Sequence, residues 1–510
     1  MLTYTFPMRK MRCLIAILFI QIIHIRPVGC ETFQHQESGQ ALRQLEQNVR
    51  YHTLSNGMRV ILYRRGNAPV FSGALVVKVG GVDEEPGYTG LSHLLEHMAF
   101  KGTKTIGTKD YRKEKPLLDR LEVYEKKLID GKALSSEEQA DYDSVTESLK
   151  ELWILGDFNN LYDMHGASGL NATTDKELTK YFVNLPRNAL EFWCWIESER
   201  LLNPVMRQFY QERDVVLEER RMRFDDSPRG KLYENTLSVA YLSHPYRYPV
   251  IGYEFDIRRL TSEKAAWLHS QYYVAPNIAI SLVGDIDSDN DIKLIEKYFS
   301  RVPSIMPPAK TLIPESAQVG ERQVVIEHSA AKHIYVAYHK PTYPHPDDPA
   351  ISIMAEILAG GRVSPLYREL VKDRRIVTSI GQSEAPGYSY PNLLIFSAQP
   401  NSPHSNQDVL TAFDRVLGKF LQEGPSADEL LIAKRSVAMQ YLGHLKSNIS
   451  LAKDFASAAL VYNNHLASVE WYDKAMKVSV DDVKRVANQY LTRSNRTVAT
   501  IENSQRVEGS

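Results

Sequence analysis

Three side chains near residue 95 have the types and the spacing needed to hold a metal ion and use it: His93, Glu96 and His97. An α-helix turns 100° per residue, so His93 and His97 would lie on nearly the same face, about 6 Å apart. Two imidazoles at this spacing can both reach one Zn²⁺ ion at about 2.0 to 2.1 Å, and Glu96 could take a proton from an attacking water. The order His-x-x-Glu-His is the reverse of the commoner His-Glu-x-x-His. The alternative is a core helix whose histidines form hydrogen bonds and bind no metal.

A catalytic zinc site needs a third protein ligand, and its best source is the segment FYQERDVVLEERRMRF, Phe209–Phe224. On a helix Glu212 and Glu219 fall within about 20° of each other on an apolar face, whereas Glu218 points about 100° away. Burying an unpaired carboxylate costs several kcal/mol, so we expect a metal or an imidazole beside these acids. We therefore expect Glu219 to be the third ligand and Glu212 to orient a ligand histidine. Two acids on an ordinary charged helix are the alternative.

The elements around these residues predict an α+β domain over residues 50–301. Strands are predicted at Arg59–Tyr63, Ala74–Val79, Lys180–Asn184 and Ile278–Gly284. Helices are predicted at Pro186–Leu202 and Phe209–Phe224. The proline-rich segment within residues 302–320 reads as a linker.

A second domain, residues 321–505, is expected to repeat the order of the first. It opens with predicted strands at Arg322–His328 and His333–Tyr338 and continues with a helix at Ile351–Ala359. No two of its histidines are four residues apart. We therefore expect no second metal helix there.

Residues 111–155 are predicted to be an inserted helical hairpin. Their apolar residues alternate between spacings of four and three, as in two paired helices: Leu117, Leu121, Tyr124, Leu128, then Tyr142, Val145, Leu149 and Leu152. Ser135 and Glu138 predict a capping box at the start of the second helix. A solvated hairpin is the simpler interpretation, and a docking or gating arm is the alternative.

Composition excludes several classes of function. The chain has 510 residues, 43% of them hydrophobic and 24% charged, which is ordinary for a globular protein of several domains. Its 61 basic and 62 acidic residues give a net charge of −1, so no overall field favours nucleic acid as a partner. Cys194 is the only cysteine in the expected folded body, which leaves no disulfide framework.

The N-terminus predicts export from the cytoplasm. Basic residues precede the apolar run Cys13–Ile25. A helix of that length spans about 20 Å, short of the roughly 30 Å hydrocarbon core, so we expect a cleaved signal peptide over residues 1–30 and no transmembrane span in the mature protein. The protein would then be periplasmic or secreted. Lipid anchoring through Cys30 is a minority alternative, because Pro27 stands where a lipoprotein signal has an aliphatic residue.

Over most of the mature chain the sequence resembles the pitrilysin, insulin-degrading-enzyme and mitochondrial-processing-peptidase family of inverted-motif zinc peptidases. The matching segments, in order, are HTLSNGMRVIL, DEEPGYTGLSHLLEHMAFKGT, NATTDKELTKY, ERDVVLEE, HPYRYPVIG, YYVAPNIAISLVGD and LAGGRVSPLYREL. The resemblance implies one zinc ion bound by His93, His97 and Glu219, with Glu96 as the catalytic base. It also implies that Asn171 and Ala172 lie on an edge strand that pairs with the substrate backbone.

The resemblance also implies the fold: two related α+β domains, each an antiparallel sheet flanked by helices, with two such pairs closing around a chamber. The chain departs from the family in two places. The gap between His97 and Glu219 is longer than usual, and the inserted hairpin accounts for the excess. Catalytically complete members carry an Arg and a Tyr, seven residues apart, that hold the substrate carbonyl, whereas this chain has Val371 and Thr378 at those positions.

These features together predict a zinc-dependent endopeptidase that cuts peptides or unfolded segments. Because Val371 and Thr378 lack the expected donors, we expect a heteromer in which a related zinc-less subunit supplies the Arg/Tyr pair. A homodimer, or local replacement by Arg374 or Tyr367, is the alternative. A non-catalytic assembly subunit is a further alternative, against which the four intact catalytic positions argue. A mitochondrial processing subunit fits the motifs but not the leader.

Overall fold

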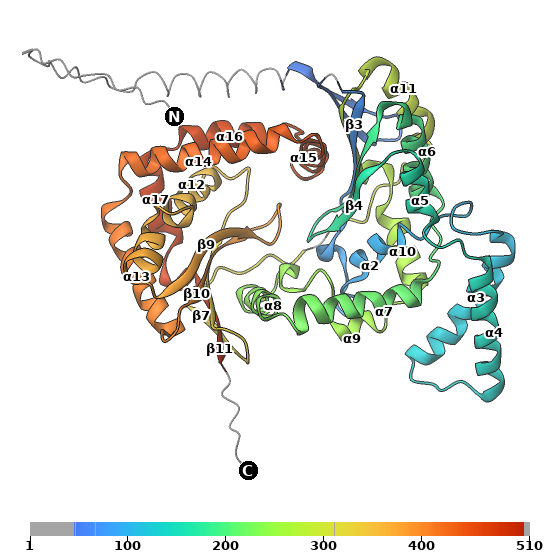
Figure 1. The fold of residues 1–510 in the computed structure, drawn as a ribbon, viewed down its shortest axis with the longest axis horizontal. Helices are drawn as coiled ribbons and strands as arrows, with labels where there is room; N and C mark the ends of the chain where they lie inside the picture. Colours follow the sequence, from blue (N-terminus) through green and yellow to red (C-terminus); the bar gives the residue numbers. More distant parts are fainter. Residues whose placement is uncertain (1–44, 46, 67, 311, 504–510) are drawn as a thin grey trace, which may run out of the picture. The chain divides into compact units, whose positions relative to one another are not determined.

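A computed structural model describes residues 45, 47–66, 68–310 and 312–503 of the chain. Two sheets flanked by helices form its framework (Figure 1), which confirms the expected α+β class. The expected signal peptide, residues 1–30 with Cys30, lies outside the described residues. Among the residues that are described, no helix combines the length and the apolar character needed to cross a bilayer.

The first sheet has six strands. They are β1 (Val49–Thr53), β2 (Arg59–Arg64), β3 (Val70–Val77), β4 (Ser168–Thr174), β5 (Thr179–Pro186) and β6 (Ile278–Gly284). Their order is β1-β2-β6-β3-β5-β4, so β4, which carries Asn171 and Ala172, is an edge strand. The sheet was expected to be antiparallel, but β2 and β6 are parallel. β6 is the last strand of this domain in the sequence, and the long helical segment before it lets the chain return to the sheet from either end. β6 lies between β2 and β3 and runs in the same direction as β2.

The first domain contains the predicted helices, with shifted ends, and further helices that were not predicted. They are α2 (Leu91–Met98), α3 (Tyr111–Ile129), α4 (Ser136–Leu152), α5 (Asp157–Met164), α6 (Leu190–Leu202), α7 (Phe209–Arg220), α8 (Pro228–Ala240), α9 (Glu254–Ile257), α10 (Ser262–Tyr272) and α11 (Ser288–Phe299). α6 begins later than predicted because Pro186 is still the last residue of β5. α7 gives way to a wider π-type turn at Arg221–Asp225.

The second sheet repeats the mixed arrangement with five strands. They are β7 (Arg322–His328), β8 (His333–Lys340), β9 (Val377–Ala385), β10 (Asn392–Pro400) and β11 (Arg496–Asn503). Their order is β7-β11-β8-β10-β9, with β7 and β11 parallel. The helices of this part are α12 (Asp348–Ala359), α13 (Asn406–Glu423), α14 (Ala427–Lys446), α15 (Asn448–Val461), α16 (Ala467–Lys477) and α17 (Val480–Tyr490).

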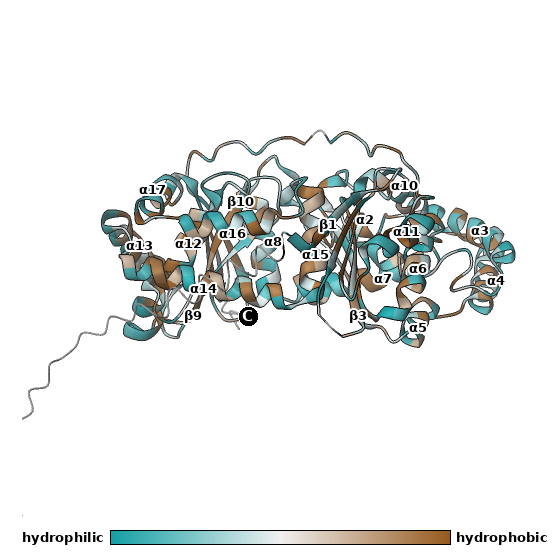
Figure 2. Cartoon of the chain, turned by 90° about the horizontal axis from the view of Figure 1, so that it is seen from above, coloured by the Kyte–Doolittle hydropathy of each residue, from teal (hydrophilic) through white to brown (hydrophobic). Residues whose placement is uncertain are grey.

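Helix α15 belongs to the second half of the chain but packs on the first sheet, against β3 and β6 (Figures 1 and 2). The sheet face that it covers carries small buried residues such as Ala74, Ala279 and Ser281. The opposite face, with its larger Leu and Ile side chains, packs on helices of the first domain. Small side chains let a helix approach a sheet closely, and the buried Phe455 of α15 makes an edge contact with Tyr63, with 6.0 Å between ring centroids.

Helix α8 makes the reciprocal contact. It follows α7 in the first domain but packs on the second sheet, where Leu232 joins Ala499 and Ile501, and Leu237 joins Ile395. Each sheet therefore has one face covered by its own helices and the other face covered by a helix from the other half. Because an apolar sheet face must be buried, the two halves depend on each other for stability.

The inserted segment forms the expected pair of helices, α3 and α4, with the Ser135–Glu138 capping box in place. The hairpin projects from the first domain, yet its inner seam is continuous with the core (Figure 1). Leu121, Val145 and Leu149 are buried in that core. At the base, Trp153 Nε1 donates a hydrogen bond of 2.9 Å to the fully buried Glu114. The hairpin is therefore solvated on its outside and anchored on its inside.

The helix exchange leads to a stability prediction. Phe455→Ala should lower the free energy of unfolding by about 3 to 5 kcal/mol, because it leaves a cavity between α15 and the first sheet. Ser457→Ala, on the same helix and only partly buried, should change it by less than about 0.5 kcal/mol. Urea unfolding of the full chain measures both. Equal stability of the two variants would show that α15 is dispensable to the first sheet.

Candidate metal centre

The histidine helix α2 starts at a point that Glu84 fixes. The Glu84 carboxylate accepts hydrogen bonds from the backbone N–H groups of Gly90 (2.9 Å) and Ser92 (2.6 Å), which would otherwise be unpaired at a helix start. Burial raises the pKa of Glu84 to about 8. Gly90 has φ +92°, and a Cβ there would come within 2.5 Å of the Ile251 carbonyl oxygen. Only glycine fits this position.

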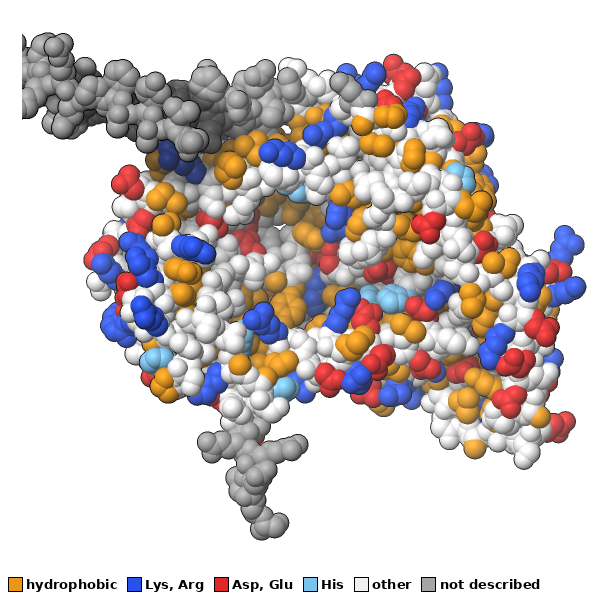
Figure 3. Space-filling model, in the orientation of Figure 1, with side chains coloured by type: hydrophobic (Ala, Val, Ile, Leu, Met, Phe, Trp, Pro, Cys, Tyr) orange, Lys and Arg blue, Asp and Glu red, His pale blue; other side chains and the backbone are white. Residues whose placement is uncertain are grey.

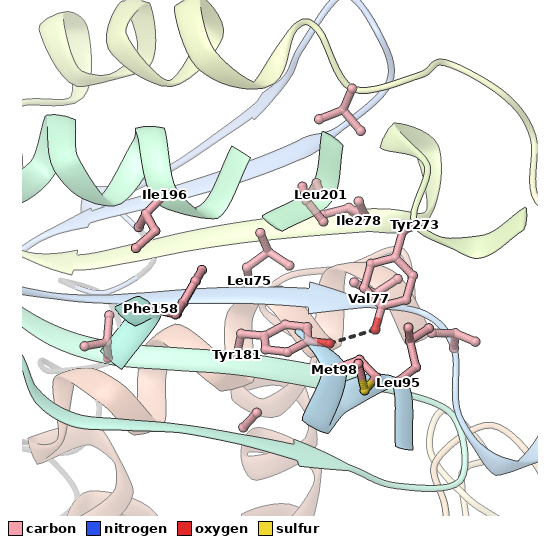
Figure 4. Close-up of a cluster of buried hydrophobic side chains, with 14 of the residues drawn as sticks. Leu75, Val77, Leu95, Met98, Phe158, Tyr181, Ile196, Leu201, Tyr273 and Ile278 are labelled. Carbon is pink, nitrogen blue, oxygen red and sulfur yellow. Dashed lines mark hydrogen bonds between the residues drawn. The ribbon is translucent and has the colours of Figure 1, made fainter. Parts of the chain in front are cut away.

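The apolar face of α2 holds the helix against the sheet. Leu91, Leu94, Leu95 and Met98 are all buried in the first-domain core. Figure 4 shows Leu95 and Met98 beside Tyr181 and Tyr273, whose hydroxyl groups lie 2.8 Å apart. With this face packed, the helix turns His93 and His97 away from the core. Their side chains keep 12% and 22% of their surface exposed.

His93, His97 and Glu219 meet at one point. One ligand atom from each lies within 4.8 Å of the others. His93 Nε2 is 3.7 Å from Glu219 Oε2, and His97 Nε2 is 3.5 Å from the same oxygen. Donors at about 2.0 to 2.1 Å from a tetrahedral ion lie roughly 3.3 Å apart, so two imidazoles and a carboxylate with these separations fit one zinc-sized cation. No other such group of three is found within the described ranges.

Glu212 lies behind the cluster and contacts His97. Its Oε1 is 2.9 Å from His97 Nδ1, and its Oε2 is 2.5 Å from the ammonium of Lys101. We assign the Nδ1 proton to His97, which donates it to Glu212 and leaves Nε2 free on the side of Glu219. Glu218 points away from the cluster and pairs with Arg221 on the surface, as the helical phase predicts.

The protonation of the two histidines differs because their surroundings differ. Burial lowers the pKa of His93 to about 3, with a smaller contribution from the nearby His97. Burial also acts to lower the pKa of His97, but the hydrogen bond and charge of Glu212 outweigh it and raise that pKa. His93 is therefore neutral at pH 7 and has a lone pair to offer.

Glu96 lies next to the cluster and is held by a residue that the sequence interpretation did not single out. Thr174 Oγ1 donates a hydrogen bond of 2.5 Å to Glu96 Oε2. Burial raises the pKa of Glu96, and the Thr174 hydrogen bond opposes that rise. Thr174 ends strand β4, so the carboxylate is tied to the strand that carries Asn171 and Ala172.

The sequence contained signals for two of the missed residues. Thr174 closes the motif NATT, and Lys101 follows His97 by one helical turn. A buried Glu212 carboxylate needs a cation beside it, and Lys101 has the spacing from His97 that would place it there. The partnership of Glu84 with the start of α2 had no such signal, because it depends on the conformation of the loop between them.

Asn171 and Ala172 lie where the edge strand is free. β4 pairs with β5 on one side and has no strand on the other in the part of the chain that the structure describes. Asn171 is exposed, and its Oδ1 accepts a hydrogen bond of 2.8 Å from the Ala172 N–H. Val371 and Thr378 lie in the second domain. Val371 packs against the core there, and the Thr378 hydroxyl donates to the Gln399 carbonyl at 3.3 Å.

Two family models match the chain. Residues 59–117 match the model described as insulinase (peptidase family M16), and residues 259–437 match the model described as the peptidase M16 inactive domain. The second match fits the lack of a metal cluster among the described residues of the second domain.

Similar proteins support the same family. The zinc protease PqqE of Helicobacter pylori is 27% identical over 458 residues, which cover 88% of this chain and 92% of that protein. The crystal structure of a protease from Helicobacter pylori matches with a TM-score of 0.75 at 25% identity, over 89% of this chain and 99% of that one. The first half of the periplasmic protease PqqL from Escherichia coli shares the fold, with a TM-score of 0.67 at 18% identity over 90% and 92%. The chain is therefore similar to M16 (insulinase) family peptidases over both of its domains.

Proposed function

We propose that the chain is a zinc-dependent endopeptidase that hydrolyses peptides or unfolded polypeptide segments. The observation that carries the proposal is the meeting of His93, His97 and Glu219 at one point, with Glu96 beside them. Two neutral or polarised imidazoles and a carboxylate are the donor set of a catalytic zinc site with one position left open. The relatives named zinc proteases support the same assignment.

In this function each side chain has a distinct task. A zinc ion held by His93, His97 and Glu219 would acidify water and polarise the scissile carbonyl. Glu96 accepts the proton of the attacking water and delivers it to the leaving amine. Thr174 keeps the Glu96 carboxylate in one orientation. Glu212 keeps the His97 ring in the orientation that presents Nε2.

The substrate class follows from the free edge of β4. A peptide that pairs with this edge near Asn171 and Ala172 must be extended, with its backbone N–H and C=O groups free. A folded protein offers few such segments. Backbone pairing also gives weak sequence preference, so we propose a peptidase that selects for extended, unfolded chains.

We further propose that the active form is a heteromer and that the protein is exported. Neither Val371 nor Thr378 offers an Arg- or Tyr-like donor, and the Arg374 guanidinium is paired with Glu369 at 2.7 Å. A related zinc-less subunit would supply the Arg and Tyr that steady the developing oxyanion. Export is supported by the N-terminal leader pattern, with a periplasmic or secreted location.

The role of Glu96 has a direct test. Glu96→Gln should keep zinc but lose peptide cleavage by several orders of magnitude, because an amide cannot accept the proton of water. Zinc content by atomic emission and cleavage of a quenched fluorescent peptide measure the two properties. Substantial cleavage by this variant would contradict the proposed mechanism.

The ligand role of Glu219 is tested against its neighbour. Glu219→Gln should weaken zinc binding by about 10-fold or more, whereas Glu218→Gln should leave it unchanged, because only Glu219 faces the histidines. Both variants remove one charge from the same helix. Competition with a chromophoric chelator gives the affinities, and equal values would reject Glu219 as ligand.

The heteromer proposal predicts slow turnover by the chain alone. Each missing oxyanion donor typically costs about 10² to 10³ in rate, so the isolated chain should fall far below a kcat of roughly 1 s⁻¹. Adding a related zinc-less M16 subunit should restore turnover. A purified chain that works at an ordinary rate, and gains nothing from such a partner, would show that the partner is unnecessary.

A further inference from the structure

The inserted hairpin contacts the zinc-ligand helix α7 through a row of acidic side chains on α3. Three acids of α3 each meet a donor on, or just before, α7. The pairs are Glu114 with Arg207 (2.6 Å), Glu122 with the Tyr210 hydroxyl (2.5 Å) and Glu125 with Arg213 (3.5 Å). The Glu122 carboxylate also accepts a hydrogen bond of 2.5 Å from Ser262 on α10. The hairpin is therefore fastened to two helices of the metal domain.

Two of the three donors lie within two residues of Glu212 on α7. Tyr210 lies two residues before Glu212 on α7, and Arg213 is the next residue after it. Their side chains face the hairpin while Glu212 faces His97. Fixing the residues on both sides of Glu212 fixes the rotation of the first helical turn, and with it the direction of the Glu212 carboxylate.

The third donor acts through the turn after α2. The Arg207 guanidinium donates hydrogen bonds to the backbone carbonyls of Lys101 (2.7 Å), Ile106 (3.1 Å) and Thr103 (3.1 Å). That turn carries Lys101, whose ammonium pairs with Glu212. Glu114 of the hairpin accepts hydrogen bonds from the same guanidinium. The hairpin therefore also supports Glu212 indirectly, through Arg207 and the turn that carries Lys101.

Beside its apolar seam, the hairpin also borders an open space. A cavity of about 380 Å³ lies between the hairpin and the two helices, lined by Leu118, Glu122, Phe209 and His269 among others. The hydrogen bond between Tyr210 and Glu122 borders this space. It can therefore be removed without taking an apolar side chain out of the core.

We propose that the hairpin α3–α4 is a brace that positions Glu212 and, through it, the ligand His97. In this role the hairpin raises the affinity of the metal centre without touching the metal. The inference rests on the proposed zinc site. It assigns a task to the segment that makes the gap between His97 and Glu219 long, and Tyr210 and Arg213 become positioning residues.

A matched pair of variants tests the brace. Tyr210→Phe removes a hydroxyl that donates a 2.5 Å hydrogen bond to Glu122, across the contact between hairpin and α7. Tyr124→Phe removes a hydroxyl that donates a 2.5 Å hydrogen bond to Asp141, inside the hairpin. Glu122 keeps Ser262 as a partner in the first variant, so no carboxylate is stranded.

Zinc affinity of the full chain, by chelator competition, is the first readout. Tyr210→Phe should weaken zinc affinity by about 3- to 10-fold, which is less than the roughly 10- to 100-fold typical of a direct partner of a ligand histidine, because Tyr210 acts through Glu212. Tyr124→Phe should change it by less than about 2-fold. Equal affinities of the two variants would overturn the brace.

Hydrogen–deuterium exchange of the metal-free chain is the second readout, and it does not depend on zinc. Tyr210→Phe should speed exchange in Phe209–Arg220, and Tyr124→Phe should not. If the wild-type chain binds no zinc, the proposed function fails, while exchange still decides whether the hairpin orders α7. Unchanged exchange in Tyr210→Phe would then overturn the brace by itself.

Discussion

The cost of burying carboxylates is the constraint on which the metal domain depends. Glu84, Glu96, Glu212 and Glu219 all lie near helix α2 with little exposure, and each has a partner of a different kind. Glu84 receives backbone N–H groups, Glu96 a hydroxyl, and Glu212 an imidazole and an ammonium. Glu219 faces both histidines and is reached from the surface by Arg223 at 2.9 Å. A divalent cation between Glu219 and the imidazoles would complete this balance.

The second domain also supplies partners to buried acids near the candidate metal centre. Its β9–β10 loop docks on the turn that follows Thr174. There Glu177 accepts hydrogen bonds from the backbone N–H groups of Tyr388 (2.7 Å) and Ser389 (2.9 Å), and the Tyr388 hydroxyl donates to Asp175 at 2.9 Å. Helix α15 of the second domain already packs on the first sheet, and this loop adds contacts beside the end of strand β4. The strand that orients Glu96 is thus fixed from both domains.

Helical phase was enough to predict which side chains meet at the candidate site, because it depends only on spacing. It places His93 with His97 and separates Glu219 from Glu218, and the structure has the same arrangement. Local patterns also predicted β2, β5 and β6 with nearly the bounds that the structure has, but they placed the start of β3 four residues late. The edge position of β4 was expected from the family resemblance alone. The parallel pairing of β2 with β6, the contact of Thr174 with Glu96 and the exchange of α8 and α15 could not be derived in this way. Each joins segments far apart in the chain, and nothing in the local sequence specifies which partner is chosen.

A comparison of α2 with α12 shows how the helix of the candidate metal centre differs from the helix at the equivalent place in the second domain. The sequence LSHLLEHMA of α2 corresponds to ISIMAEILA of α12, where Ser and Glu are kept and two isoleucines replace the histidines. Every residue of α12 except Ser352 is buried, since other helices surround it, and Glu356 accepts a hydrogen bond of 2.5 Å from Ser436. On α2 the imidazoles keep an open side, and a second helix brings its own acids to them. The candidate metal centre on α2 thus combines histidines, an open face and an acidic neighbouring helix, and α12 has no histidine and no open face. In this chain the acidic neighbour is α7, and the inserted hairpin α3–α4 contacts it through Glu122 and Glu125.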